Sequence, residues 1–79
     1  MNNLEKYNQA FISALSITAD KLTDDLKYQD ITEWDSVGHM ALIAELEDTF
    51  GIMMDTDDII DFNSYAKGKE LLGKYNISF

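Results

Sequence analysis

The sequence predicts an all-α protein, a four-helix bundle with a short third helix and a long loop between helices one and two. Apolar residues recur at helical spacing in residues 3–15 and 36–50. No segment shows the sustained alternation of apolar and polar residues that is typical of strands. A chain of 79 residues has the size of one folded unit, so we assign residues 1–79 to a single domain.

The first helix is predicted over residues 3–15. Asn2 or Asn3 can cap its start, because a short polar side chain there accepts a hydrogen bond from a first-turn amide. Its apolar face, which we expect to pack on the core, consists of Leu4, Tyr7, Phe11, Ala14 and Leu15.

A long polar connection follows, over residues 16–35. Loops of this length inside a compact domain are usually functional or are held down by their own apolar side chains. We expect four such side chains to anchor it: Leu22, Leu26, Tyr28 and Ile31.

The second helix is predicted over about residues 36–50, and it ends at Gly51, a favourable residue for a left-handed cap. At about 100° per residue, its apolar side chains fall on two roughly opposite sides. The larger side chains form the expected core face, with His39 among them: Leu42, Ile43, Leu46 and Phe50. The other side, called the outer strip below, consists of Val37, Met40, Ala41 and Ala44, bordered by Glu47 and Asp48.

We expect the outer strip to be exposed and to dock partner proteins. Its apolar side chains supply contact area, and its acids can meet lysine or arginine across an interface. The flexible thioether of Met40 suits a surface that contacts more than one partner. The alternative is a helix buried on both sides, as the central helix of a bundle can be.

A short third helix is predicted in the segment "DTDDIIDF", residues 55–62, whose early acids suit the positive end of a helix. The last helix begins at Asn63 or Ser64 and ends near Gly73. Gly68 lies inside it and costs about 1 kcal/mol relative to alanine.

Composition and charge exclude several classes of protein. Fifteen acids against six basic residues give a formal net charge of −9, which repels a phosphate backbone, so we expect no nucleic-acid binding. The longest apolar run, "MALIA", is too short to span a membrane, and the N-terminus does not resemble a secretory signal. We therefore expect a soluble, cytoplasmic monomer whose partners have basic surfaces.

Asp35 and Ser36 lie where the second helix begins. Together with His39 they have the residue types of a hydrolytic triad, but a triad needs side chains that converge from separate elements. We therefore expect no catalytic triad at the start of this helix. A Ser or Asp at this place is usually a plain N-cap. Because a helix N-terminus also stabilises anions, a hydroxyl here could carry a phosphodiester toward solvent.

The run "WDSVGHMALIAELEDTFGI", residues 34–52, resembles the acyl carrier protein family. In that family Asp-Ser, followed by Leu or Val, opens an apolar helix that ends in an acidic pair, Phe, Gly and Ile. The resemblance extends over almost the whole chain. It implies a carrier domain in which a phosphopantetheinyl transferase attaches 4′-phosphopantetheine from coenzyme A to Ser36, with support from Asp35. The thiol of this arm would hold an acyl or aminoacyl group as a thioester.

The same resemblance implies that the partners are an adenylating ligase or an acyltransferase with a basic docking surface. It also places Val37, Met40, Glu47 and Asp48 on the helix that such enzymes recognise. Trp34 resembles the Trp-Asp-Ser of stand-alone carriers in specialised pathways, including D-alanyl and aminoacyl carriers. The cargo is left open.

Two other classes of protein compete with the carrier interpretation. An unmodified acidic helical adaptor would use the same outer strip without a prosthetic group. A calcium-binding EF-hand loop beginning at Asp55 fails, because its sixth and twelfth positions are Ile60 and Ala66 rather than Gly and Glu. No metal site is predicted.

Overall fold

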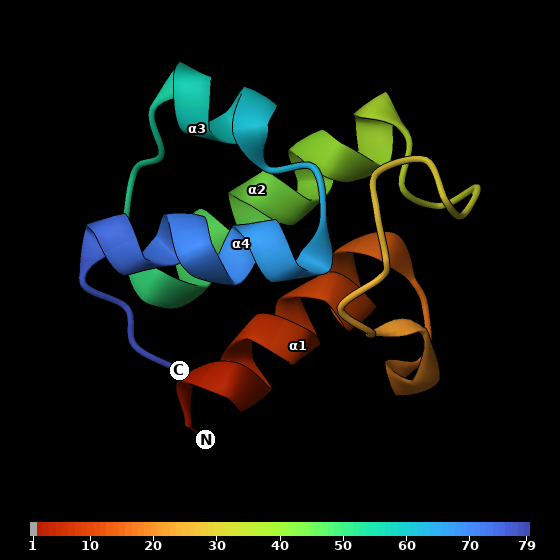
Figure 1. Cartoon of the computed structure of the whole chain (residues 1–79), viewed down its shortest axis with the longest axis horizontal. Helices are drawn as coiled ribbons and strands as arrows, with labels where there is room; N and C mark the ends of the chain where they lie inside the picture. Colours follow the sequence, from red (N-terminus) through yellow and green to blue (C-terminus); the bar gives the residue numbers. More distant parts are fainter. Residues whose placement is uncertain (1) are drawn as a thin grey trace.

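The computed structural model describes residues 2–79, and in this part of the chain it is mostly helical and contains no strand. The predicted helical class is therefore confirmed. Within residues 2–79, four α-helices and two short 3₁₀ helices follow one another (Figure 1): α1 (Asn3–Leu15), η1 (Ala19–Lys21), α2 (Ser36–Phe50), α3 (Thr56–Asp61), α4 (Tyr65–Leu72) and η2 (Gly73–Tyr75).

The two ends of the described chain lie side by side in Figure 1. A hydrogen bond of 2.9 Å joins them, donated by the Asn3 side-chain amide to the carbonyl of Ser78. The first and last segments of the described chain are therefore in direct contact.

The predicted ranges of α1, residues 3–15, and of α2, about residues 36–50, agree with the structure. Asn2 caps α1 by accepting a hydrogen bond from the amide of Glu5, and the left-handed backbone of Gly51 ends α2. Helix α4 stops at Leu72, and the chain continues as η2 instead of ending at Gly73. These helix ends follow from local side-chain chemistry, which is why the sequence predicts them well.

The loop between α1 and α2 is fastened to the junction of α3 and α4. The Tyr28 amide donates to the Asn63 carbonyl, and the Tyr65 amide donates to the Leu26 carbonyl, each over 2.9 Å. Leu26 is buried, and three further apolar side chains of this loop pack on the core, namely Leu22, Tyr28 and Ile31. The loop also contains the short helix η1, which no sequence pattern predicts.

An aromatic cluster fills the core between the helices. The fully buried Trp34, the last loop residue but one before α2, meets the ring of Phe11 edge to face at 5.4 Å between centroids. Phe11 in turn contacts Phe62 and Tyr65. Because Trp34 is held in the core, the start of α2 has a fixed position relative to α1.

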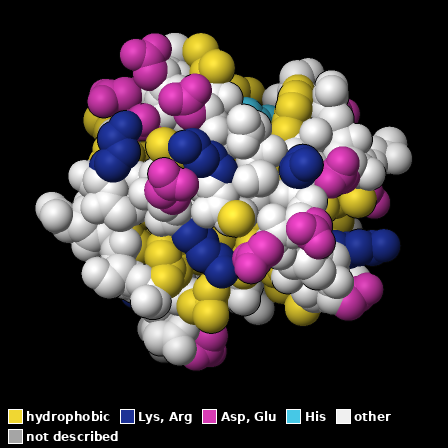
Figure 2. Space-filling model, viewed as in Figure 1, with side chains coloured by type: hydrophobic (Ala, Val, Ile, Leu, Met, Phe, Trp, Pro, Cys, Tyr) yellow, Lys and Arg dark blue, Asp and Glu magenta, His cyan; other side chains and the backbone are white. Residues whose placement is uncertain are grey.

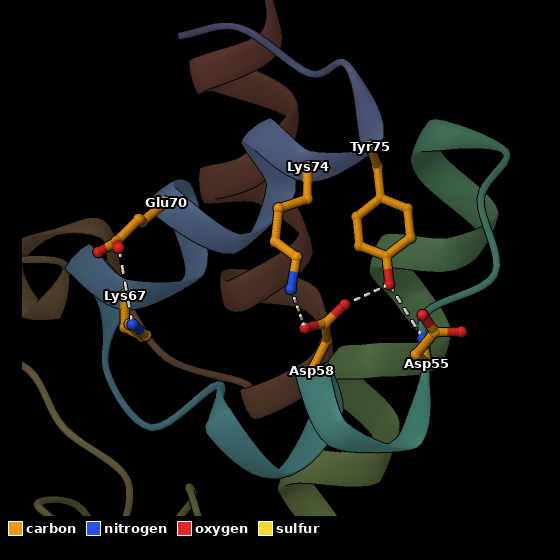
Figure 3. Close-up of polar contacts among 6 residues, drawn as sticks. All are labelled: Asp55, Asp58, Lys67, Glu70, Lys74 and Tyr75. Carbon is orange, nitrogen blue, oxygen red and sulfur yellow. Dashed lines mark hydrogen bonds and ion pairs between the residues drawn. The ribbon is translucent and has the colours of Figure 1, made fainter.

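Helix α3 is bound to the C-terminal segment through Asp58, which is buried at 4% exposure (Figure 3). Lys74 Nζ and the Tyr75 hydroxyl each donate to this carboxylate over 2.6 Å, and the Asp55 amide donates to the Tyr75 oxygen over 2.9 Å. These bonds lower the pKa of Asp58, chiefly through the hydrogen bond from Lys74 and then through that from Tyr75. They raise the pKa of Lys74 and Tyr75, in each case mainly through the hydrogen bond to Asp58.

Charges of both signs are interspersed on the face drawn in Figure 2, with acidic side chains gathered at the upper left, where α3 lies. Two more lysines face acids, since Lys67 lies 3.6 Å from Glu70 and Lys69 lies 3.9 Å from Asp24. Such exposed pairs contribute little to stability. Within residues 2–79, no helix is both long and apolar enough to cross a membrane.

Candidate functional site at the start of α2

Asp35 and Ser36 have different roles in the local structure. Asp35 is the N-cap of α2, because its Oδ1 accepts a hydrogen bond of 2.8 Å from the Gly38 amide. Ser36 is the first helical residue, and it is exposed. The N-cap interpretation therefore holds for Asp35 and is wrong for Ser36, whose hydroxyl does not serve as the cap.

The chain bends sharply just before this pair. The Gln29 amide donates to the Trp34 carbonyl over 2.9 Å, and the Trp34 amide donates to the Ile31 carbonyl over 3.2 Å. Gly38 permits the approach of this turn to α2, because a Cβ at that position would collide with the Glu33 carbonyl. Because Trp34 is buried and Gly38 packs closely against the turn, the backbone on both sides of Ser36 is fixed by packing.

A pocket of about 330 Å³ adjoins Ser36. It lies between α2, α3, the preceding loop and the α3–α4 junction, and its lining residues are Tyr28, Ser36, His39, Met40, Ile59, Ile60, Phe62 and Asn63. No pattern in the sequence predicts this pocket. Its α3 wall lies more than twenty residues from Ser36 along the chain, and no local pattern reports such a contact.

His39 joins the pocket to the core. The Trp34 Nε1–H donates to His39 Nδ1 over 3.0 Å, and His39 Nε2 lies 2.9 Å from the Ile59 carbonyl oxygen. Since Nδ1 accepts and a carbonyl can only accept, the imidazole proton is on Nε2. Both ring nitrogens are thus engaged in structural hydrogen bonds, so His39 has no nitrogen left to act as a general base for Ser36.

Most of the outer strip is exposed. Val37 and Met40 have exposed fractions of 77% and 57%, and Ala41, Ala44 and Asp48 are exposed as well. The alternative of a helix buried on both sides is therefore wrong, while the docking role of these residues stays a prediction.

Glu47, at the border of the outer strip, differs in exposure from the strip residues. It is half-buried, and its Oε2 accepts a hydrogen bond of 2.9 Å from the Met54 amide. One of its carboxylate oxygens therefore fixes the segment that follows α2. The helical wheel places Glu47 at the border of the strip, but it cannot report a bond to a residue beyond the end of the helix.

The electrostatics at Ser36 favour an anion. The amides of Ser36 and Val37 are the first two of α2, so they have no partner within the helix. The aligned peptide dipoles add a partial positive charge at the same end. A negatively charged group on the Ser36 oxygen would therefore be stabilised by the backbone.

A scan of the chain against models of known protein families finds no match. The resemblance to acyl carrier proteins thus rests on residues 34–52 and on the order of the helices.

Proposed function

We propose that this protein is a carrier that holds an acyl or aminoacyl group as a thioester on 4′-phosphopantetheine attached to Ser36, and presents it to partner enzymes. The observation that carries the proposal is the position of Ser36, an exposed residue at the first turn of α2 that lies beside an apolar pocket. With it we propose the finer fold, a four-helix bundle with a short third helix.

The residues around Ser36 fit the prosthetic group. Ser36 is an exposed residue, as an attaching enzyme requires, and the first amides of α2 would face the phosphodiester. When bound, the group supplies the thiol on which cargo is held, which this cysteine-free chain lacks. Asp35 would act twice, as the cap of α2 and as a carboxylate that supports the Mg²⁺-bound coenzyme A during attachment.

The outer strip would be the docking surface for the phosphopantetheinyl transferase and for an adenylating ligase or acyltransferase. Its apolar side chains offer contact area beside Asp48, in a chain of net charge −9. A partner with a basic surface would be steered toward it. The carrier itself performs no chemistry in this scheme.

The test is incubation with coenzyme A, Mg²⁺ and a broad-specificity phosphopantetheinyl transferase, followed by intact mass measurement. One added phosphopantetheine is expected on the wild type and none on Ser36→Ala. The matched control is Ser13→Ala, which removes an exposed serine of α1 and should leave the modification unchanged. A wild type that stays unmodified contradicts the proposal.

The second candidate is an unmodified adaptor, and the exposure of Val37 and Met40 favours it equally. It predicts that Ser36→Ala leaves the affinity for every partner unchanged. The carrier proposal predicts instead that the same substitution abolishes cargo transfer.

A further inference from the structure

Helix α3 has almost no apolar anchor of its own. Among its six residues, all of which the structure describes, the only buried one is Asp58. Ile59 is partly buried, and Ile60 is 70% exposed. The side chain of the N-cap residue Asp55 forms no cap bond to the helix. Because isolated helices of this length are unstable in water, contacts from other parts of the chain must keep α3 folded.

Three hydrogen bonds hold α3 to η2 (Figure 3). Lys74 Nζ and the Tyr75 hydroxyl each donate to one oxygen of the Asp58 carboxylate over 2.6 Å. The Tyr75 oxygen also accepts a hydrogen bond of 2.9 Å from the amide of Asp55, the residue before α3. The pair of Lys74 and Tyr75 is called the latch below.

The latch residues lie on a fixed segment. Leu72, just before η2, is fully buried, and Ile77, shortly after it, is 8% exposed. The Ile77 amide donates to the Leu72 carbonyl over 3.2 Å and so closes the turn between them. The Tyr75 ring itself packs against the core. If the latch contacts break, α3 is therefore the partner that moves.

Both ends of α3 are fixed as well. Met54, two residues before the helix, is buried, and its amide donates to the Glu47 carboxylate over 2.9 Å. Phe62, just after the helix, is 1% exposed and belongs to the aromatic cluster of the core. Movement of α3 is thus confined to residues 55–61.

Asp58 couples the latch to the position of α3. A buried carboxylate without hydrogen-bond partners is strongly unfavourable. If Lys74 and Tyr75 withdrew while α3 stayed in place, Asp58 would be in that state, whereas opening of α3 would expose its carboxylate to water. The remaining bond, between His39 Nε2 and the Ile59 carbonyl, joins uncharged groups. It is weaker than the bonds to the carboxylate.

We propose that Lys74 and Tyr75 control a local opening of α3. While they bind Asp58, the helix is closed. When they leave it, residues 55–61 open as one unit and α1, α2 and α4 stay folded. Local openings of this kind occur where a segment has few buried apolar contacts.

The opening changes the surface beside the candidate site. In the closed state Ile60 of α3 and Met40 of α2 line the same pocket next to Ser36. In the open state Ile60 leaves this place, and the exposed side of α2 stays unchanged. The latch is a property of the unmodified chain, so it does not depend on the proposed function.

The first test is amide hydrogen exchange of the unmodified wild type, followed by NMR at rising urea concentrations below the unfolding transition. The Ile59 and Phe62 amides report on α3, because they donate to the Asp55 and Asp58 carbonyls. Their exchange should depend on urea much less than that of the slowest amides of α1 and α2, because opening of residues 55–61 exposes little surface. Equal rates and equal urea dependence would overturn the proposal.

The second test uses variants of the latch. Tyr75→Phe removes the hydroxyl and keeps the ring, and Lys74→Met removes the charge. Each should speed exchange at Ile59 and Phe62 by about tenfold or more, because a bond to a charged group is lost in the closed state only. Lys67→Met is the matched control, since it removes a lysine whose ion pair lies on the surface of α4. Its rates should stay within about twofold of the wild type.

Unchanged exchange of α3 in both latch variants would also overturn the proposal, since α3 would then open without breaking the latch. If Lys74→Met fails to fold, Tyr75→Phe and the urea series on the wild type still decide. A wild type that is never modified at Ser36 contradicts the carrier function and leaves these measurements interpretable. Conversely, a normally modified protein in which α3 exchanges only with the whole chain contradicts the latch alone.

Discussion

Gly68→Ala separates two opposing effects inside α4. By helix propensity alone, alanine at this interior position should stabilise the protein by about 1 kcal/mol. The structure predicts the opposite, because the new Cβ would collide with the Phe62 ring and the Tyr7 hydroxyl. Both side chains are buried, so neither can move into solvent.

The magnitude follows from these contacts. Overpacking of a closely packed core costs about 1–3 kcal/mol, and the upper end applies here because both neighbours are aromatic and buried. The Tyr7 hydroxyl also donates to the Tyr65 carbonyl over 2.6 Å, and this bond would be strained. Subtracting the gain in propensity leaves a net loss of about 2 kcal/mol. For a domain of this size, that loss lowers the melting temperature by roughly 8–16 °C.

The assay is thermal and urea unfolding, followed by circular dichroism and by the fluorescence of the buried Trp34. Gly73→Ala is the matched control, because nothing lies within 4 Å of its Cβ and its backbone is helical at φ −58° and ψ −30°. It should be neutral or stabilising by up to about 1 kcal/mol. A Gly68→Ala protein as stable as the wild type would refute the packing argument.

Three further predictions concern the site and the C-terminal contact. Asp35→Ala should lower the free energy of unfolding by about 1 kcal/mol, because α2 loses its cap. Asp35→Asn should keep the stability and slow the attachment of phosphopantetheine. Equal attachment rates for the Asp35→Asn variant and the wild type would show that the carboxylate charge is not needed. Asp58→Asn should lower the melting temperature at neutral pH. Because the folded-state pKa of Asp58 is depressed by Lys74 and Tyr75, its contribution is present above the unfolded pKa of about 4 and is lost as the pH falls through the folded value. The difference in melting temperature between the variant and the wild type should therefore disappear in acid. A difference that stays constant in a pH series would contradict this. Met40→Glu should change the free energy of unfolding by less than about 0.5 kcal/mol, since Met40 is 57% exposed. The same substitution should weaken cargo transfer by a partner enzyme. Loss of helicity in the variant would show that the Met40 side chain supports the fold.

Features that depend on neighbouring residues could be predicted from the sequence. The bounds of α1 and α2 follow from helical spacing and from the caps at Asn2, Asp35 and Gly51, all of which act within a few residues. The exposure of the outer strip follows from the same periodicity, with Val37 and Met40 as its most prominent members.

Features that join distant segments could not be predicted. The Nε2 of His39 bonds to the carbonyl of Ile59, twenty residues away, and Ile59 also lines the pocket. The hydrogen bond between Asp58 and Lys74 spans sixteen residues. The sequence pattern predicts Asp58 only as one of the early acids of a short helix. Gly68 was predicted as a cost to helix α4, whereas its missing side chain is what lets Phe62 and Tyr7 pack together.

The most direct test of the carrier account is the state of the protein in the cells that produce it. The native protein, purified without reducing agent and digested, should yield a peptide containing Ser36 that carries one phosphopantetheine in tandem mass spectrometry, in part with a thioester-bound group. Native protein with a bare Ser36 under all growth conditions, or with the phosphopantetheine on another residue, would contradict the account.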